Sequence, residues 1–316
     1  MHLLIPFAAP LSDAGQAALG TLVLPNLATL LARWSRVAGS GSDGDGNGDA
    51  FSLSTPHERA LAATWGWVAP DGLLPFAAVA AADDGLTPQP DGPGWGLVQL
   101  SHWHADAQQV AVTDPAALRL DEAGARQFFD ALAPLFGDDG WALHWGTATR
   151  WYATHASLVT LPTASLDRVI GRDIDIWLQS HPDARKLRRL QAEAQMLLHA
   201  HPLNAEREDQ GLPAVNSFWL SGTGITALPD PARRKTVCVD DRLRAPALAE
   251  DWAAWVEAWA ALDAEVLPAL LNPQQAPLLT LCGERGAQTW APQALPLWRR
   301  WFGPRQADFA TALSAL

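Results

Sequence analysis

The last third of the chain contains two short apolar runs that are typical of buried strands, Val237–Val239 and 278–281. Between them lies a predicted helix over about residues 247–271. Its tryptophans recur every three or four residues, at Trp252, Trp255 and Trp259, and this spacing predicts a buried stripe. A strand, a helix and a second strand predict a βαβ unit, because parallel strands need a long crossover connection. We therefore expect an α/β protein with these two strands paired in parallel.

The remaining pattern predicts an interrupted base. With 316 residues, the chain is long enough for two modest domains. An apolar run at residues 2–8 predicts a first strand, and residues 13–38 have a mainly helical pattern. We expect residues 1–38 and 226–316 to form an α/β base with a mixed sheet. Residues 51–225 would form an inserted α+β section.

Residues 39–50 contain only Gly, Ser, Asp, Asn and Ala, which predicts a flexible acidic loop. Four of them match positions 1, 3, 5 and 6 of a calcium-binding loop, namely Asp43, Asp45, Asn47 and Gly48. The twelfth position is Ser54, where that motif needs a bidentate Glu. A plain loop is therefore the favoured interpretation.

Local sequence patterns predict several helices and strands in the inserted section. Thr55 and Glu58 have the spacing of a capping box, which predicts a helix from there to about residue 65. Further helices are expected at residues 121–136 and 183–200. In the latter, the basic residues fall largely outside the apolar face, at Arg185, Lys186, Arg188 and Arg189. A solvated face explains them more readily than a ligand cradle does. The predicted strands are residues 97–100 and 109–112, which would form a hairpin around 102–107, and residues 141–145 and 150–155.

Charge and hydropathy exclude several classes of protein. The net charge of −12 argues against binding to nucleic acid, which needs a basic face. It equally disfavours docking on anionic lipid. The longest apolar run, residues 73–82, is far shorter than the roughly 20 residues that a membrane-spanning helix needs. The first residues lack the pattern of a signal peptide, so we expect a cytoplasmic protein. Its two cysteines, Cys238 and Cys282, fall in predicted strands and are expected to be buried, inert thiols.

Few residues have the spacing of a catalytic or metal site. His102, His104 and Asp106 alternate as metal ligands on a strand would, but no further cluster of ligand residues accompanies them. A polar hairpin is the favoured interpretation. The sequence contains no P-loop, no Gly-x-Gly-x-x-Gly and no Gly-x-Ser-x-Gly motif. Neither a metal nor a cofactor is therefore expected.

The densest polar stretch runs over residues 199–224. It contains His201, Asn204, Arg207 and Asn216, and it ends in Gly222-x-Gly224. With Arg150, these four polar residues could form a pocket for a phosphate or carboxylate, since Arg pairs with such anions bidentately. The alternative is structural. The Asn residues would cap helices or close turns, and Arg207 would bind the backbone carbonyls that end the preceding helix.

The same stretch resembles the signature of the RpfE-type regulatory proteins of proteobacteria. The matching residues are His199-x-His201-Pro202-Leu203-Asn204-x-x-Arg207 and Pro213-x-x-Asn216-Ser217-x-Trp219-x-x-Gly222-x-Gly224. Smaller matches include Thr55-Pro56-x-Glu58 and Arg150-Trp151-Tyr152. The resemblance spans residues 1–225.

That family is similar in turn to the archaeal-type, cofactor-independent phosphoglycerate mutases, which carry a related His-Pro-x-Asn-x-x-Arg segment. The similarity implies a mutase-like fold with a two-metal site. Where those enzymes have Asp-Gly after their first strand, this chain has Phe7-Ala8-Ala9-Pro10, and no histidine follows Gly224. The resemblance therefore implies a degenerate relative without the metal ligands.

Together these observations predict a non-catalytic cytoplasmic protein that is regulatory or senses a ligand. Its partner would be a small anionic metabolite or another protein. The alternative is a phosphoglycerate mutase or a related phosphoryl-transfer enzyme. No catalytic residue is assigned.

Overall fold

The computed structural model describes residues 1–37, 50–105, 109–138, 140–178, 181–271, 277–293 and 309–316. The predicted acidic loop, 39–50, lies outside them except for Ala50. The chain is a mixed α/β protein that forms two compact units. Unit 1 is Met1–Ala50, Thr55–Trp67 and Asp230–Leu316, and unit 2 is Phe51–Ser54 and Val68–Pro229. Among the described residues, no helix has the length and apolar character needed to cross a membrane.

Unit 1 is built on a five-stranded mixed sheet in the order β2-β11-β10-β1-β9. The central strand, β1 (His2–Ile5), runs parallel to both β9 (Val237–Val239) and β10 (Leu278–Cys282). The other two strands, β11 (Ala287–Pro292) and β2 (Trp34–Arg36), continue the sheet in antiparallel pairs. The predicted βαβ unit is therefore present, but its two strands do not pair with each other. They flank β1, because the crossover passes over the first strand.

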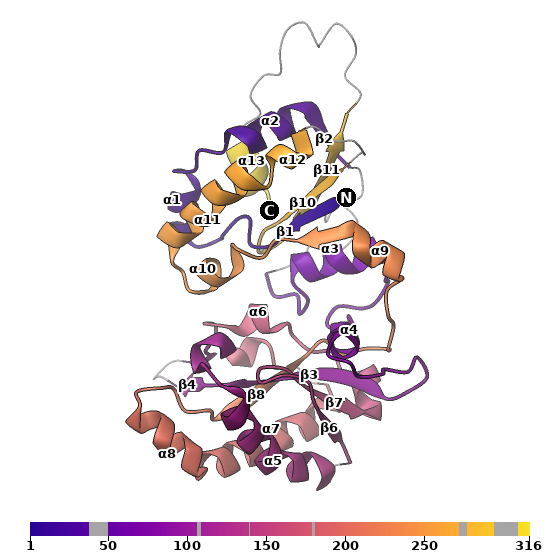
Figure 1. Cartoon of the computed structure of the whole chain (residues 1–316), viewed down its shortest axis with the longest axis vertical. Coiled ribbons are helices and arrows are strands. Elements are labelled where there is room, and N and C mark those ends of the chain that lie inside the picture. Colours follow the sequence, from indigo (N-terminus) through magenta and orange to yellow (C-terminus); the bar gives the residue numbers. More distant parts are fainter. Residues whose placement is uncertain (38–49, 106–108, 139, 179–180, 272–276, 294–308) are drawn as a thin grey trace, which may run out of the picture. The chain divides into compact units, whose positions relative to one another are not determined.

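Helices lie on both sides of this sheet (Figure 1). One group shares a core with β1 and β10; it comprises α1 (Asp13–Leu19), α2 (Pro25–Arg33), α11 (Trp252–Glu265), α12 (Pro268–Leu271) and α13 (Phe309–Ser314). The short α10 (Arg244–Leu248) packs on α11. On the opposite side, α3 (Pro56–Trp65) packs against β1, β10 and β11, with α9 (Pro231–Thr236) beside it.

The start of helix α3 is predicted correctly from its local sequence, but the unit to which the helix belongs is not. The Thr55 side chain accepts from the Glu58 backbone and the Glu58 carboxylate accepts from the Thr55 backbone, so the predicted capping box is confirmed. The same helix was expected in the inserted section. It belongs to unit 1 because its buried face, which includes Ala62 and Trp65, packs on the sheet of that unit.

The predicted tryptophan helix at 247–271 is broken into α10, α11 and α12. The break after α10 contains Glu250, whose φ of 52° is incompatible with a continuous helix. Within α11, Trp255 and Trp259 are fully buried, whereas Trp252 is only partly buried. The buried stripe is therefore confirmed at two of its three positions.

Unit 2 is built on a four-stranded antiparallel sheet in the order β6-β7-β3-β8. Its strands are β3 (Gly94–Ser101), β6 (Ala142–Trp145), β7 (Trp151–His155) and β8 (Ser217–Ser221). Figure 1 shows α5 (Glu122–Asp138) and α7 (Ala184–His199) along one face and α4 (Phe76–Asp83) on the other. Alternation along the strands explains the two faces. Val98 and Leu100 join the core with α5 and α7, while Trp95 joins the core with α4.

Shorter elements complete unit 2. They are β4 (Trp103–Ala105), β5 (Val110–Val112), η1 (Pro115–Leu118), η2 (Ala156–Val159), α6 (Leu166–Val169), η3 (Ile174–Ile176) and α8 (Pro202–Asp209). The predicted hairpin of 97–100 with 109–112 is wrong. β3 instead pairs with β7 and β8, and the hairpin is formed by β4 and β5. The burial prediction for cysteine holds at Cys282 but is wrong at Cys238, which lies exposed on the edge strand β9.

Candidate functional site

The first two predicted site residues bind the protein's own backbone. Asn204 is buried on α8, where its Nδ2 donates to the carbonyls of Leu198 and Val215, both at 2.8 Å. Its Oδ1 accepts from the Val215 backbone at 2.8 Å. Arg207, which is 6% exposed, donates from Nε and Nη2 to the Pro213 carbonyl. Together the two side chains connect the end of α7 to the approach to β8.

Arg207 also reaches a distant part of the chain. Its Nη2 donates to the carbonyl of Leu118, in η1, at 2.6 Å. Burial lowers the pKa of the guanidinium, while the charge of Asp121 opposes that shift. A buried Arg needs hydrogen-bond acceptors to replace its water, and carbonyls supply them here, as in the structural alternative. They are the carbonyls of Pro213 and Leu118, however, and not those that end the preceding helix.

His201 and Asn216 likewise have structural partners. His201 is the N-cap of α8, its Nδ1 accepts from the Leu203 backbone, and its ring lies 4.8 Å from that of Phe128. Burial lowers its pKa, so the imidazole is neutral at pH 7. The Asn216 amide pairs with the Trp103 backbone in both directions, at 2.7 and 2.8 Å.

The fifth predicted residue, Arg150, has a different set of partners. Its guanidinium pairs with Asp84, at the end of α4, with distances of 2.6 and 3.1 Å. The Tyr152 hydroxyl donates to the same carboxylate at 2.5 Å. No hydrogen bond or ion pair between described residues joins Arg150 to the other four. The contacts of the five residues therefore do not support one shared anion pocket.

Gly222 and Gly224 also have an internal role. They follow β8 with φ values of 71° and 138°, which disfavour any residue with a side chain. A Cβ at Gly222 would lie 2.8 Å from the Ala77 backbone, and one at Gly224 would lie 2.4 Å from the Leu73 carbonyl. The close approach that these glycines allow is therefore to the chain itself.

The histidine pair near the β4–β5 hairpin does not form a metal site with its described neighbours. The His102 and His104 rings stack with their centroids 6.4 Å apart, and His102 Nδ1 donates to the Ala214 carbonyl at 2.8 Å. Asp106 lies outside the described residues. Throughout the described ranges, no three His, Cys, Asp or Glu side chains gather as metal ligands would.

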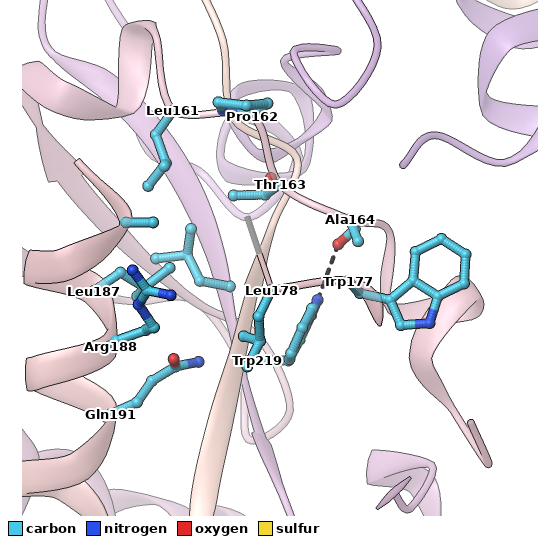
Figure 2. Close-up of a pocket in the computed structure, with 12 residues that line it drawn as sticks. Leu161, Pro162, Thr163, Ala164, Trp177, Leu178, Leu187, Arg188, Gln191 and Trp219 are labelled. Atoms are coloured by element: carbon cyan, nitrogen blue, oxygen red, sulfur yellow. Dashed lines mark hydrogen bonds between the residues drawn. The ribbon is translucent and has the colours of Figure 1, made fainter. Parts of the chain in front are cut away.

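One pocket in unit 2 is lined by α7, β8 and the segments before α6 and α7 (Figure 2). We call it the α7–β8 pocket. It encloses about 30 Å³, and its walls are mostly apolar: Leu161, Pro162, Thr163, Ala164, Trp177, Leu178, Ala184, Leu187, Arg188, Gln191, Trp219 and Leu220. Figure 2 shows Leu187, Arg188 and Gln191 on the helix side, facing Leu178 and Trp219.

The polar side chains that line the α7–β8 pocket differ in whether they form hydrogen bonds within the protein. Trp219 Nε1 donates to the Ala164 carbonyl at 2.9 Å, and Gln191 Nε2 donates to the Phe218 carbonyl at 3.2 Å. The Thr163 hydroxyl is bonded to that of Thr223 at 3.0 Å. The Arg188 guanidinium, by contrast, has no hydrogen bond or ion pair with any residue that the structure describes.

A second, more open groove of about 580 Å³ lies beside the β4–β5 hairpin. Its lining residues are Trp103, Ala105, Val110, Ile174, Gln195, Met196, His199 and Asn216. Met196 is 69% exposed. The groove thus combines an apolar floor with two amides and one imidazole, and its lining contains no carboxylate that could assist the histidine as a general base.

In unit 1, the carboxyl end of β1 is closed by indoles. Trp255 Nε1 donates to the Phe7 carbonyl at 3.0 Å, and Trp259 Nε1 donates to the Ala8 carbonyl at 3.3 Å. Ala8 is 0% and Ala9 3% exposed. The segment that follows β1 therefore packs against α11.

Sequence reasoning missed the residues of the α7–β8 pocket. It did not single out Gln191, and it placed Arg188 on a solvated face without relating it to a pocket; the structure confirms that Arg188 is exposed. One signal was available: Gln191 lies four residues after Leu187 and three before Ala194, so a polar residue interrupts the apolar stripe. Such an interruption indicates a buried polar contact, which the bond from Gln191 to Phe218 provides.

No family model and no curated protein matches the chain. Among solved structures, it is similar to a cofactor-independent phosphoglycerate mutase from Thermoplasma acidophilum DSM 1728, with 11% identity and a TM-score of 0.38 over 98% of this chain and 94% of the other. It is also similar to the PH0037 protein from Pyrococcus horikoshii, with 13% identity and a TM-score of 0.42 over 92% and 87% of the two chains. Similarity of this degree carries no information about the activity of this chain.

Proposed function

We propose that this chain is a non-catalytic, ligand-sensing regulatory protein of the cytoplasm that binds a small ligand in the α7–β8 pocket. The observation that carries the proposal is the apolar pocket bordered by Arg188, a solvent-exposed residue whose guanidinium has no hydrogen bond or ion pair with any described residue. Apolar walls with a few convergent polar groups are the usual composition of small-molecule sites. A ligand here would touch both α7 and β8, so its binding would stabilise their packing.

The side chains of the pocket favour binding over catalysis. The described residues of its lining include no carboxylate, histidine or cysteine, so they offer no general base and no activated nucleophile. Its amide and indole groups already bond to backbone carbonyls. The anion-binding role earlier assigned to Arg150 and Arg207 passes in this proposal to Arg188, because those two arginines are engaged elsewhere.

A substitution that fills the pocket tests the proposal. Leu187→Trp on α7 adds bulk at the pocket wall, and Leu197→Trp adds the same bulk on the same helix outside the pocket. In a thermal-shift screen of small metabolites, we expect ligands that stabilise the wild type and the Leu197→Trp variant but not the Leu187→Trp variant. A screen without any stabilising ligand, or one whose hits survive Leu187→Trp, contradicts binding at this pocket.

The second candidate is phosphoryl transfer. The observation in its favour is the parallel arrangement of β9, β1 and β10, since α/β sheets bind ligands beyond the carboxyl ends of such strands. The buried Ala8 and Ala9 oppose it. Elemental analysis of purified protein, combined with a mutase assay, tests this alternative. Two divalent metals per chain together with turnover of a phosphoglycerate would replace the ligand-sensing proposal.

A further inference from the structure

The size of the α7–β8 pocket limits what can enter it. A cavity needs about 10–15 Å³ to hold one water molecule, so the volume of about 30 Å³ in this partly open pocket corresponds to roughly two or three water-sized groups. A sugar, a nucleotide or an aromatic ring is too large to be enclosed. The enclosed part of a ligand is therefore a short chain.

The side chains that line the pocket indicate the chemical composition of this short ligand chain. Leu161, Leu178 and Leu220 contribute hydrocarbon side chains to the lining, the Trp219 N–H donates to the Ala164 carbonyl, and one N–H of Gln191 donates to the Phe218 carbonyl. A polar group placed among these side chains would lose its hydration without gaining a partner, which costs free energy. The enclosed atoms are therefore expected to be aliphatic carbon.

The positive charge of Arg188 indicates which chemical group the end of the ligand outside the leucines carries. Arg188 belongs to the lining, and the first turn of α7 carries no acidic residue. The N-terminal end of a helix is itself partly positive. Of two carboxylates on or next to α7, Glu193 pairs with Arg189, and Asp183 lies 3.6 Å from the His181 ring nitrogen. A planar carboxylate is the anion that a guanidinium binds with two parallel hydrogen bonds.

We propose that the α7–β8 pocket binds a short aliphatic monocarboxylate, with two or three carbons of its tail enclosed by leucines and its carboxylate paired with Arg188. This inference rests on the proposed ligand binding at the same pocket. The predicted anion site indicated a phosphate or carboxylate. A phosphate has no hydrocarbon part to fill the apolar pocket, so the inference names a carboxylate with an aliphatic tail.

The probes are propionate and butyrate, with 1-propanol as the neutral analogue and inorganic phosphate as the anion without a tail. Binding is measured on the full chain by ligand-observed NMR titration at constant ionic strength. We expect both carboxylates to bind, with 1-propanol and phosphate at least tenfold weaker. Arg188→Gln should weaken carboxylate binding at least tenfold, whereas the control Arg185→Gln, on the same helix but outside the lining, should change it less than twofold.

The outcomes separate the ligand class from the site. If 1-propanol or phosphate binds as tightly as propionate, or if Arg188→Gln has no effect, the carboxylate assignment is wrong. Binding that is still abolished by Leu187→Trp would then leave the pocket itself in place. Propionate binding that is unchanged in the Leu187→Trp variant overturns both the inference and the proposed function.

Discussion

At the scale of single residues, Arg207 determines how the polar stretch after α7 is understood. Its guanidinium donates to the Pro213 and Leu118 carbonyls from a position that is 6% exposed. We expect Arg207→Ala to lower the free energy of unfolding by about 3 kcal/mol without any ligand, because buried carbonyls lose charged donors. Urea denaturation measures the change. An exposed control, Arg185→Ala, should cost less than about 0.5 kcal/mol.

A loss below about 1 kcal/mol in Arg207→Ala would contradict the clamp role. It would return Arg207 to the group of candidate ligand-binding residues, particularly if phosphate stabilised the wild type and not the variant.

Asp84 gives the second prediction at this scale. The hydrogen bond from Arg150 holds the pKa of its carboxyl below the usual value, although burial opposes that shift. A depressed pKa in the folded state means that the contribution to stability is complete above the unfolded pKa, near 4, and is lost as pH falls through the folded pKa. We expect Asp84→Asn to cost about 1 kcal/mol at pH 7, as for other partly exposed ion pairs. In urea denaturation series from pH 7 to 3, the gap between wild type and variant should narrow below pH ~4. A gap independent of pH would show that folding does not lower the pKa of Asp84.

At the scale of elements, α2 depends on a side chain from another helix. Leu24, at its N-cap, makes no side-chain hydrogen bond. Instead the buried Asp263 of α11 accepts from the Leu27 backbone at 2.8 Å and from the Asn26 backbone at 3.1 Å. We expect Asp263→Ala to destabilise the protein by about 1–2 kcal/mol, as the loss of a helix cap does. Asp251→Ala, which removes the exposed cap of α11, should cost less. Equal losses, measured by denaturation, would mean that burial of Asp263 adds nothing.

Helix α11 also carries the largest buried side chains of unit 1. Trp255 is 0% exposed and packs among residues from β1, β10 and α2. We expect Trp255→Ala to lower the free energy of unfolding by about 3–5 kcal/mol, because it leaves a cavity. The partly exposed Trp252 provides the control, and Trp252→Ala should cost distinctly less. If the two variants were equally stable in denaturation experiments, the tryptophan stripe would not be core.

At the scale of the whole molecule, the two units have separate cores. Chains with more than one core commonly depart from two-state unfolding. We expect calorimetry to resolve two transitions. Asp263→Ala should lower mainly the transition of unit 1, and Arg207→Ala mainly that of unit 2. A single transition that both variants lower alike would show that the units unfold cooperatively.

Features that depend on residues a few positions apart can be predicted from the sequence of this chain. The capping box before α3, the apolar face of α7 and the strands β6 and β7 follow from local spacing, and each is present. The mixed α/β class also follows, because strand and helix patterns alternate along the chain.

Contacts between segments that are distant in the sequence could not be predicted and are seen only in the folded structure. β1 lies between β9 and β10, although its own sequence shows only that it is apolar. Arg207 reaches the carbonyl of Leu118, 89 residues away, and Gln191 bonds to β8. The sequence shows which side chains can donate hydrogen bonds but not which acceptors they meet. An Arg side chain could therefore bind either backbone carbonyls or an anion, and only the fold shows which of these lies within reach. For the same reason the sequence predicts correctly that Arg188 is solvated, but only the packing of α7 on β8 shows that it borders an apolar pocket.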